Sequence, residues 1–275
     1  MIPQVVHFVF GLRPQLEPFH LLHYLAIESC RRVVRPEQIK VHLHHLPYGV
    51  YWDLARPMIS VERVEPVPGL PAGDPAVAPY GYAHQADVIR LDILRREGGM
   101  YADIDTLFVR PVPECLWEAS AVIGEEAPVH YADAPAPERS LTNALLLAEP
   151  GAPFIAAWRS EIVAAMDGSW SAHSCRLATR LACSRPDTVR VEPRARFSPF
   201  AHTRESLRSL LEEPLVDGSL DETSSVHLMA HLWWDQDRRD FVRFSAQDAT
   251  ESVLRAATTP LARLAQPYLP DHGLF

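Results

Sequence analysis

The chain has 275 residues, with 35 acidic and 26 basic side chains, a formal charge of −9 and Lys40 as its single lysine. Non-specific nucleic-acid binding and polybasic membrane docking both need a positively charged face, so this charge argues against both classes. The hydrophobic fraction of 47% is normal for a globular protein, and the length fits one domain over residues 1–275 with a real core.

The N-terminal part of the chain predicts a strand–helix–strand unit. Residues 2–10 form a short apolar run with β-branched side chains, bounded by Gly11, which indicates a buried strand. Residues 17–34 carry apolar side chains at roughly helical spacing, and residues 39–46 alternate between apolar and polar. A strand, a helix and a strand in this order imply a parallel pair, and hence an α/β fold.

The rest of the chain continues the alternation of strands and helices. The clearest helix covers about residues 82–97, because Gly98-Gly99 stops it. Two stretches rich in proline, 66–80 and 128–138, are predicted loops. The other predicted elements are a short helix at 50–60, strands at 61–67, 100–104, 121–124, 144–148 and 188–191, helices at about 152–166 and 171–183, and a closing run at 225–234.

Features of cellular targeting are missing from the sequence. The N-terminus has neither a basic region nor a small-residue cleavage site, and no stretch of about 18 apolar residues occurs. The four cysteines are dispersed without a CxxC pair, which is typical of free thiols. We therefore expect a cytoplasmic protein with no integral membrane segment. The preference for arginine over lysine, with many alanines and prolines, suggests a GC-rich bacterial genome.

The segment Tyr80–Pro111 contains the residues most indicative of chemistry. Asp87 and Arg90 are three residues apart, so they share one face of the predicted helix. Asp103 and Asp105 follow an apolar strand and point to the same side, because side chains alternate along a strand. Two carboxylates so close repel each other unless a cation lies between them, and Mg²⁺ or Mn²⁺ with phosphate oxygens is the usual solution. In α/β sheets ligands bind at the carboxyl ends of strands, where this pair would lie.

Residues 86–105 read A-D-x-x-R-x-x-x-L-x-x-x-G-G-x-Y-x-D-x-D, with Asp, Arg, Gly-Gly and D-x-D at fixed spacing. This stretch resembles the sugar-binding D-x-D region of family 32-type glycosyltransferases, which include initiating mannosyltransferase-like and lipid α-galactosyltransferase-like enzymes. The opening strand 2–10 is similar to the first strand of that family. Two further segments, Thr142-Asn143-Ala144 with Pro150–Phe154, and His231-Leu232-Trp233, are similar to later family elements.

The resemblance implies a GT-A fold, a mixed sheet flanked by helices in one domain. Residues 1–125 would be the nucleotide-sugar-binding half and residues 126–275 the acceptor-side half. It also implies a hexosyltransferase that retains the anomeric configuration and depends on Mn²⁺ or Mg²⁺. Asp103 and Asp105 would hold the metal on the donor diphosphate. His231 would be a third ligand or a diphosphate contact, with His227 as the reserve candidate.

The same resemblance implies which residues meet the donor sugar. Asp87 and Arg90 would contact its hydroxyl groups, and Asn143 would approach the sugar or its anomeric carbon. These three residues are the candidate catalytic residues. Tyr101 would line the nucleotide pocket. Trp233 would be either a core residue or a stacking platform for a sugar or base, and both alternatives stay open.

The donor would be a UDP- or GDP-sugar, and the acceptor a glycan, a lipid-linked sugar, a protein or a small natural product. Two other functions remain alternatives. One is a non-catalytic sugar- or nucleotide-binding module that kept the fold. The other is a haloacid-dehalogenase-type phosphatase, because Asp103-Ile104-Asp105-Thr106-Leu107 superficially resembles its nucleophile motif. The glycine of that motif is missing, and the motif belongs on a first strand rather than after residue 100.

Overall fold

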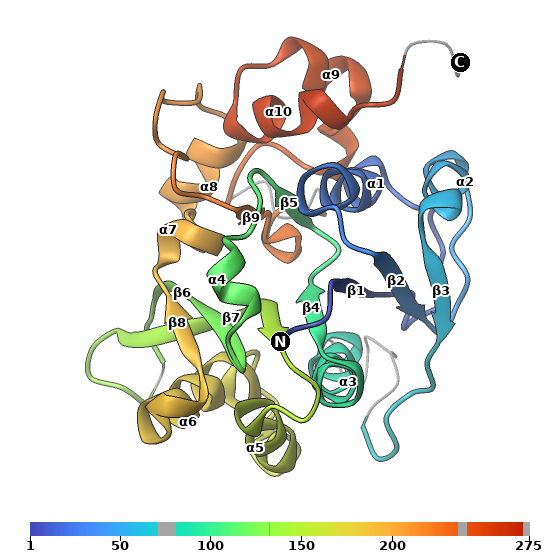
Figure 1. Cartoon of the computed structure of the whole chain (residues 1–275). Helices are drawn as coiled ribbons and strands as arrows, with labels where there is room; N and C mark the ends of the chain where they lie inside the picture. The colour runs from blue at the N-terminus through green and yellow to red at the C-terminus, as the bar shows by residue number, and fades with distance from the viewer. Residues whose placement is uncertain (71–80, 132, 236–240, 272–275) are drawn as a thin grey trace.

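A seven-stranded mixed sheet runs through the centre of the molecule, in the order β3-β2-β1-β4-β7-β6-β8 (Figure 1). The computed structural model describes residues 1–70, 81–131, 133–235 and 241–271. The strands β1 to β4 are parallel to one another, whereas β7 runs antiparallel to its neighbours β4 and β6. The strands are β1 Val5–Phe10, β2 Gln38–Leu43, β3 Ser60–Arg63, β4 Gly99–Ala102, β6 Ala121–Val129, β7 Glu138–Ala148 and β8 Arg190–Glu192.

The predicted strand–helix–strand unit at the N-terminus is confirmed. β1 and β2 are parallel over their whole length, from Val5 opposite Gln38 to Phe10 opposite Leu43. The helix between them, α1 Leu21–Ser29, continues into a π-helical turn, Cys30–Val34. The predicted α/β class, a mixed sheet flanked by helices, is therefore the observed one.

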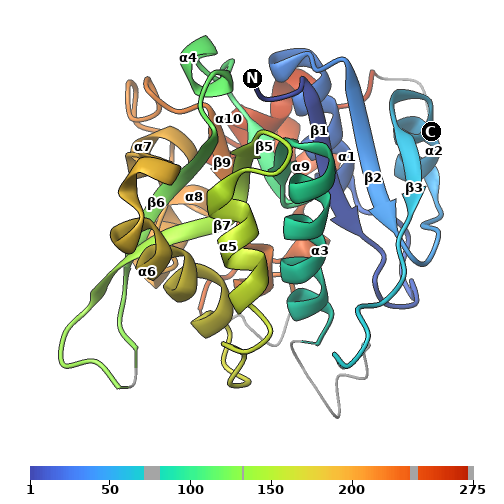
Figure 2. The ribbon, with the colours of Figure 1, turned by 60° about the horizontal axis from the view of Figure 1, so that its bottom comes forward.

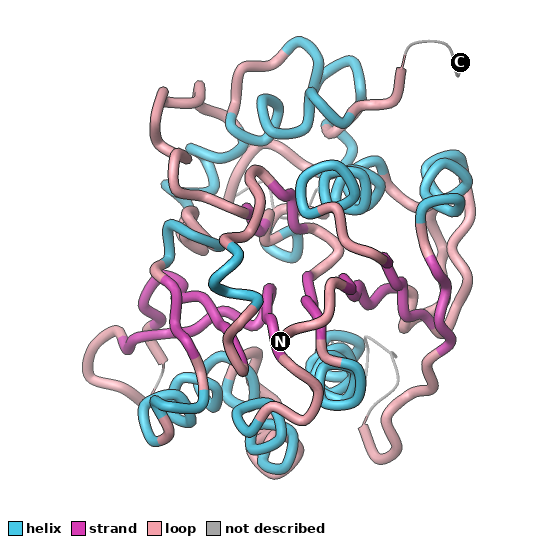
Figure 3. Tube along the Cα trace, in the orientation of Figure 1, coloured by secondary structure: helices cyan, strands magenta, loops and turns pink. Residues whose placement is uncertain are grey.

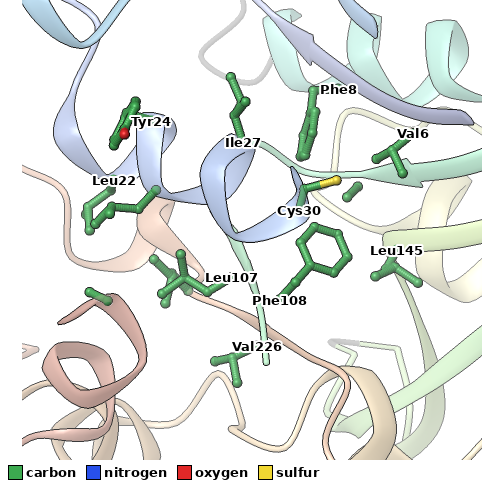
Figure 4. Packing of buried hydrophobic residues seen from close by; sticks show 14 of the residues in the cluster. Val6, Phe8, Leu22, Tyr24, Ile27, Cys30, Leu107, Phe108, Leu145 and Val226 are labelled. Carbon is green, nitrogen blue, oxygen red and sulfur yellow. The ribbon is translucent and has the colours of Figure 1, made fainter. Parts of the chain in front are cut away.

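Helices cover both faces of the sheet. Figure 2 shows α3 Gly81–Glu97, α5 Pro153–Glu161 and α6 Leu177–Ser184 side by side on one face. The other face carries α1, and α2 Val50–Ala55 packs against α1. Buried side chains accordingly form two clusters, one on each side of the sheet. Figure 4 shows part of the cluster on the α1 side of the sheet, where Ile27 of α1 and Cys30 of the π-helical turn lie near Phe8 of β1 and near Phe108.

The C-terminal third contains helices that the sequence did not predict. Figure 3 shows this region as helices joined by loops, on the same side of the sheet as α1. Their buried leucines, among them Leu207, Leu210 and Leu254, extend the core cluster beneath α1. The additional helices of the chain are α4 Glu114–Trp117, α7 Arg194–Phe197, α8 Arg204–Leu211, α9 Glu251–Ala256 and α10 Pro260–Ala265.

Two glycines make the sharp turn between α3 and β4. Gly98 and Gly99 have φ angles of +66° and +98°, a region that side chains rarely adopt. A Cβ atom on Gly99 would lie 2.6 Å from the Val5 carbonyl oxygen and 3.0 Å from His7 Nε2. The Gly-Gly pair therefore makes the sharp turn that the sequence predicted, and it allows β4 to enter the sheet directly beside β1.

Several boundaries differ from the predicted ones. β7 begins at Glu138, inside the predicted loop 128–138, because its first residues pair with the end of β6. A second, two-stranded antiparallel sheet joins β5 Thr106–Phe108 to β9 Ser225–His227. Of the predicted loop 66–80, residues 71–80 lie outside the described residues. Among the helices that the structure describes, none is long and apolar enough to cross a membrane.

Candidate active site

The two aspartates of the D-x-D motif lie on the turn that leads from β4 to β5. The Asp103 backbone N–H donates to the Ala144 carbonyl of β7 at 2.8 Å, and the Thr106 N–H donates to the Asp103 carbonyl at 3.0 Å. Because β4 is parallel to β1, this turn lies at the carboxyl edge of the parallel strands. That edge is where α/β sheets bind their ligands, so the predicted location of the pair is the observed one.

The pairing of β5 with β9 brings a histidine from far along the chain to the two aspartates. His227 lies opposite Thr106 in this pair. Its Nε2 atom is 3.2 Å from Asp105 Oδ1 and 3.8 Å from Asp103 Oδ2. One ligand atom from each of Asp103, Asp105 and His227 lies within 4.8 Å of the others, a grouping that could hold one metal ion.

Burial and charge act differently on the three side chains. Burial would raise the pKa of Asp105, but nearby His227 and the hydrogen bond from the Ala230 N–H hold it well below its usual range. Burial raises the pKa of Asp103, and this effect outweighs the opposing influence of Arg90 and His227. Burial alone would lower the pKa of His227, but Asp105 and Asp103 raise it to about 9. The two carboxylates thus have a cationic neighbour in the protein itself.

Arg90 connects the D-x-D turn to α3. Its guanidinium group is 2.9 Å from Asp87 Oδ1 and 3.4 Å from Asp103 Oδ1, with the side chain only 5% exposed. It also donates to the Asn143 carbonyl at 2.6 Å and lies over the Tyr101 ring, 4.5 Å from its centroid. A planar guanidinium suits such an arrangement, because its donors diverge in a fixed fork.

Asp87 is fully engaged by three partners. Its Oδ1 accepts from Asn143 Nδ2 at 2.7 Å and from Arg90, and its Oδ2 accepts from His173 Nε2 at 2.9 Å. The structure therefore brings Asp87, Arg90 and Asn143 together. That they contact the donor sugar, as the resemblance implies, stays a prediction. His173 was not predicted; its only sequence signal is a histidine within a predicted helix, which does not indicate such a contact.

The remaining predicted site residues lie around this centre. Tyr101 is 1% exposed, and its hydroxyl group donates to Asp103 Oδ1 at 2.5 Å. The ring therefore packs behind the Asp103 carboxylate rather than facing an open pocket. Trp233 is 0% exposed and donates to the Leu228 carbonyl at 2.7 Å, which favours its role as a core residue and argues against a stacking platform. Its neighbour Trp234 stacks on the His23 ring, with centroids 5.1 Å apart.

His231 is near the carboxylates, but His227 occupies the position expected of a ligand. The His231 ring stacks on Trp170, with centroids 4.6 Å apart. Its charge is among the influences that lower the pKa of Asp105, after burial, which raises it, and His227. The structure thus favours the reserve candidate His227 as the third ligand. A contact of His231 with the metal or diphosphate stays a prediction.

Comparison with known proteins identifies the class to which this site belongs. Residues 75–126 match the family described as a glycosyltransferase sugar-binding region containing the DXD motif. The D-x-D region of the chain belongs to this family. Its D-x-D residues, Asp103 and Asp105, lie within the matched region.

Among known relatives, Glucan organizing enzyme 1 of Cryptococcus neoformans var. grubii is 33% identical over 210 residues, which cover 74% of this chain. The matched part spans 56% of the length of that relative. The structure of an active-site mutant of LgtC aligns over 97% of both chains, at 13% identity and a TM-score of 0.49. PaToxG glycosyltransferase aligns over 67% of this chain and 70% of its own, at 15% identity and a TM-score of 0.42.

Proposed function

We propose that the protein is a metal-dependent glycosyltransferase that moves a hexose-type sugar from a UDP- or GDP-sugar to a saccharide or small-molecule acceptor. The observation that carries this proposal is the cluster of Asp103, Asp105 and His227 at the carboxyl edge of the sheet, with buried Arg90 beside it. Such a cluster, within a D-x-D region of this family, suits a sugar attached to a diphosphate.

The chemistry of the cluster fits a divalent ion. Carboxylate oxygens are preferred ligands of Mg²⁺ and Mn²⁺, and imidazole is a frequent additional ligand of transition metals. When bound, Mn²⁺ or Mg²⁺ would supply Lewis-acid neutralisation of the donor diphosphate. Asp103 and Asp105 would hold the ion, and His227 would complete its protein ligands. The Ala230 N–H fixes the Asp105 carboxylate, because it donates to Oδ2 at 2.8 Å and leaves Oδ1 to face His227.

The protein groups around the cluster would bind the sugar and stabilise the departing diphosphate. Asp87 and Asn143 present polar atoms from α3 and β7, suited to sugar hydroxyl groups. Arg90 provides a fixed positive charge close to Asp103, where negative charge develops on the leaving group. The carboxylate of Asp87 already accepts two hydrogen bonds and is paired with Arg90, so its role in this scheme is to orient the sugar. We extend retention of the anomeric configuration to this chain from the family resemblance.

Donor turnover tests the proposal. The protein would be incubated with a panel of UDP- and GDP-sugars, with saccharide acceptors and either Mn²⁺ or EDTA. We expect one donor to release its nucleoside diphosphate with Mn²⁺ and not with EDTA, and the product to keep the donor's anomeric configuration by NMR. Binding of a nucleotide sugar without release across this panel would instead favour the non-catalytic binding module. An inverted product would contradict the retaining mechanism.

A further inference from the structure

A π-helical turn, Ala172–Arg176, lies against the donor-sugar side of the candidate site and leads into α6. Its widened spacing is visible in the Arg176 N–H, which donates to the Ser171 carbonyl five residues back at 3.1 Å. Isolated π-helical turns are rare and frequently occur at functional sites. The turn is anchored from α5, because Trp158 Nε1 donates to the His173 carbonyl at 3.0 Å. This anchoring points the side chains of the turn towards α3 and β7.

The first contact of this turn is between His173 and Asp87. The His173 ring is 0% exposed, and its Nε2 lies 2.9 Å from Asp87 Oδ2. An ionised carboxylate can accept hydrogen bonds but cannot donate one. His173 Nε2 therefore carries the proton and donates to Asp87 Oδ2. The other ring nitrogen, Nδ1, is buried and has no hydrogen-bond partner among the residues that the structure describes. Among the described residues, Asp87 is therefore the hydrogen-bond partner of the His173 ring.

The second contact is between Cys175 and Asn143. The Cys175 sulfur lies 3.8 Å from Asn143 Oδ1, while Asn143 Nδ2 donates to Asp87. Burial raises the pKa of the Cys175 thiol, and the carboxylates of Glu126 and Asp87 raise it further, so the group stays an S–H donor. The side-chain amide of Asn143 is thus held at both ends, by the thiol and by the carboxylate.

We propose that His173 is a positioning residue for the donor sugar, which acts with Cys175 by fixing the orientation of Asp87 and Asn143. This inference rests on the proposed function, and both residues lie outside the matched region 75–126. Asn143 and Arg90 restrain one oxygen of Asp87, and His173 restrains the other, so the carboxylate cannot rotate. Oδ1 already faces Asn143 and Arg90, so the lone pair that remains for a sugar hydroxyl is on Oδ2, where His173 is the partner. Precise placement of such groups governs both binding and turnover.

The test compares His173→Leu, which removes the donor, with His173→Gln, which keeps an N–H. The matched control is His202→Leu, the same change at a partly buried histidine outside the site. We would measure kcat and KM for the nucleotide sugar, and the Kd of the corresponding nucleoside diphosphate, all with Mn²⁺. We expect His173→Leu to lower kcat/KM by roughly 10–100-fold with an unchanged Kd for the nucleoside diphosphate. His173→Gln should recover part of this loss, and His202→Leu should behave as wild type.

Other outcomes are distinguishable. A folded His173→Leu variant with wild-type kcat/KM would overturn the inference. So would a loss of affinity for the nucleoside diphosphate as large as the loss of kcat/KM, because that result indicates a merely structural role. If His173→Leu does not fold, His173→Gln and Cys175→Ala provide the same comparison, with the exposed Cys183→Ala as control. A wild-type protein that turns over no nucleotide sugar would overturn the proposed function, and this inference with it.

Discussion

At the scale of single residues, the two aspartates of the motif have unlike surroundings. Asp105 is bound by the Ala230 N–H and paired with His227, and these contacts favour its charged form. Asp103 receives a hydrogen bond from the Tyr101 hydroxyl and lies near Arg90, yet burial disfavours its charge. Before any ligand binds, the charged form of Asp105 is therefore favoured by the fold, whereas that of Asp103 is disfavoured.

This difference predicts opposite effects of two matched substitutions on the metal-free protein. Asp105→Asn removes a charge that the fold stabilises, so we expect the free energy of unfolding to fall by about 1–3 kcal/mol. Asp103→Asn removes a charge that burial disfavours, so the Tm should stay the same or rise. Thermal unfolding in EDTA measures both values. A lower Tm for Asp103→Asn than for Asp105→Asn would contradict this assignment.

Arg90 is the residue for which a structural role and a functional role coincide. Arg90→Ala would remove the buried arginine that is paired with the carboxylates of Asp87 and Asp103. Removing one member of a buried ion pair costs about 3–5 kcal/mol, so we expect a clear loss of stability in chemical denaturation as well as a loss of turnover. Unchanged stability of Arg90→Ala would contradict this expectation.

At the scale of secondary-structure elements, the turn between α3 and β4 sets the position of the whole motif. Gly99→Ala would place a side chain at φ +98° and against the Val5 carbonyl. Gly151→Ala is the matched control, because Gly151 has φ +74° with nothing within 4 Å of the added Cβ. Positive φ alone costs about 1–3 kcal/mol, so both variants should lose stability. The loss should be larger at Gly99, measured by urea unfolding; equal losses would mean that the close approach to β1 is unimportant.

The elements also show how far the sequence could predict this site. The helix α3, the Gly-Gly turn and the D-x-D pair are contiguous in sequence, so spacing predicted that Asp87 and Arg90 share one helix face. That these residues and Asp103 belong to one site was implied by the family resemblance. His227 and His231 could not be separated, because the choice depends on the register of two three-residue strands, β5 and β9. His173 was not predicted, because a π-helical turn changes which side chains face inwards, and helical periodicity assumes regular spacing.

The fold, like the site, could be predicted from the sequence only where local pattern determines it. Periodicity predicted the βαβ unit and the long helix α3, since local pattern determines both. It did not predict β5 or the C-terminal helices α8 to α10. The short strand and these helices are stabilised by tertiary packing against α1 and the sheet rather than by strong local signals.

At the scale of the whole molecule, the charge is −9 and there is one lysine, so under the proposed function arginines and a metal would neutralise the donor diphosphate. The single lysine does not help, because Lys40 is paired with Glu97 at 2.8 Å, at the end of α3. Near the Lys40–Glu97 pair, His7 of β1 and His42 of β2 are buried next to the Gly-Gly turn. His7 Nε2 donates to the Gly98 carbonyl at 2.9 Å, so its Nδ1 accepts from His42 Nε2 at 3.0 Å.

This neutral histidine pair predicts how stability depends on pH. Burial lowers the pKa of His7 to about 4 and that of His42 to about 3, from 6.5. The unfolded chain therefore binds more protons, and the contribution of the pair, fully present above pH 6.5, is lost as the pH falls towards 4. Urea unfolding between pH 7 and 4 should show that the wild type loses stability faster than His42→Gln. A constant difference between the two proteins over this range would contradict the neutral pair.

The central claim is that Asp103, Asp105 and His227 hold the ion that binds the donor diphosphate. Titration of Mn²⁺ followed by electron paramagnetic resonance, with the nucleoside diphosphate present, tests it most directly. We expect Asp105→Asn and His227→Gln to weaken Mn²⁺ binding by about tenfold or more, and His231→Gln to change it less. Mn²⁺ binding that survives in Asp105→Asn and His227→Gln, or that is lost only in His231→Gln, would contradict it.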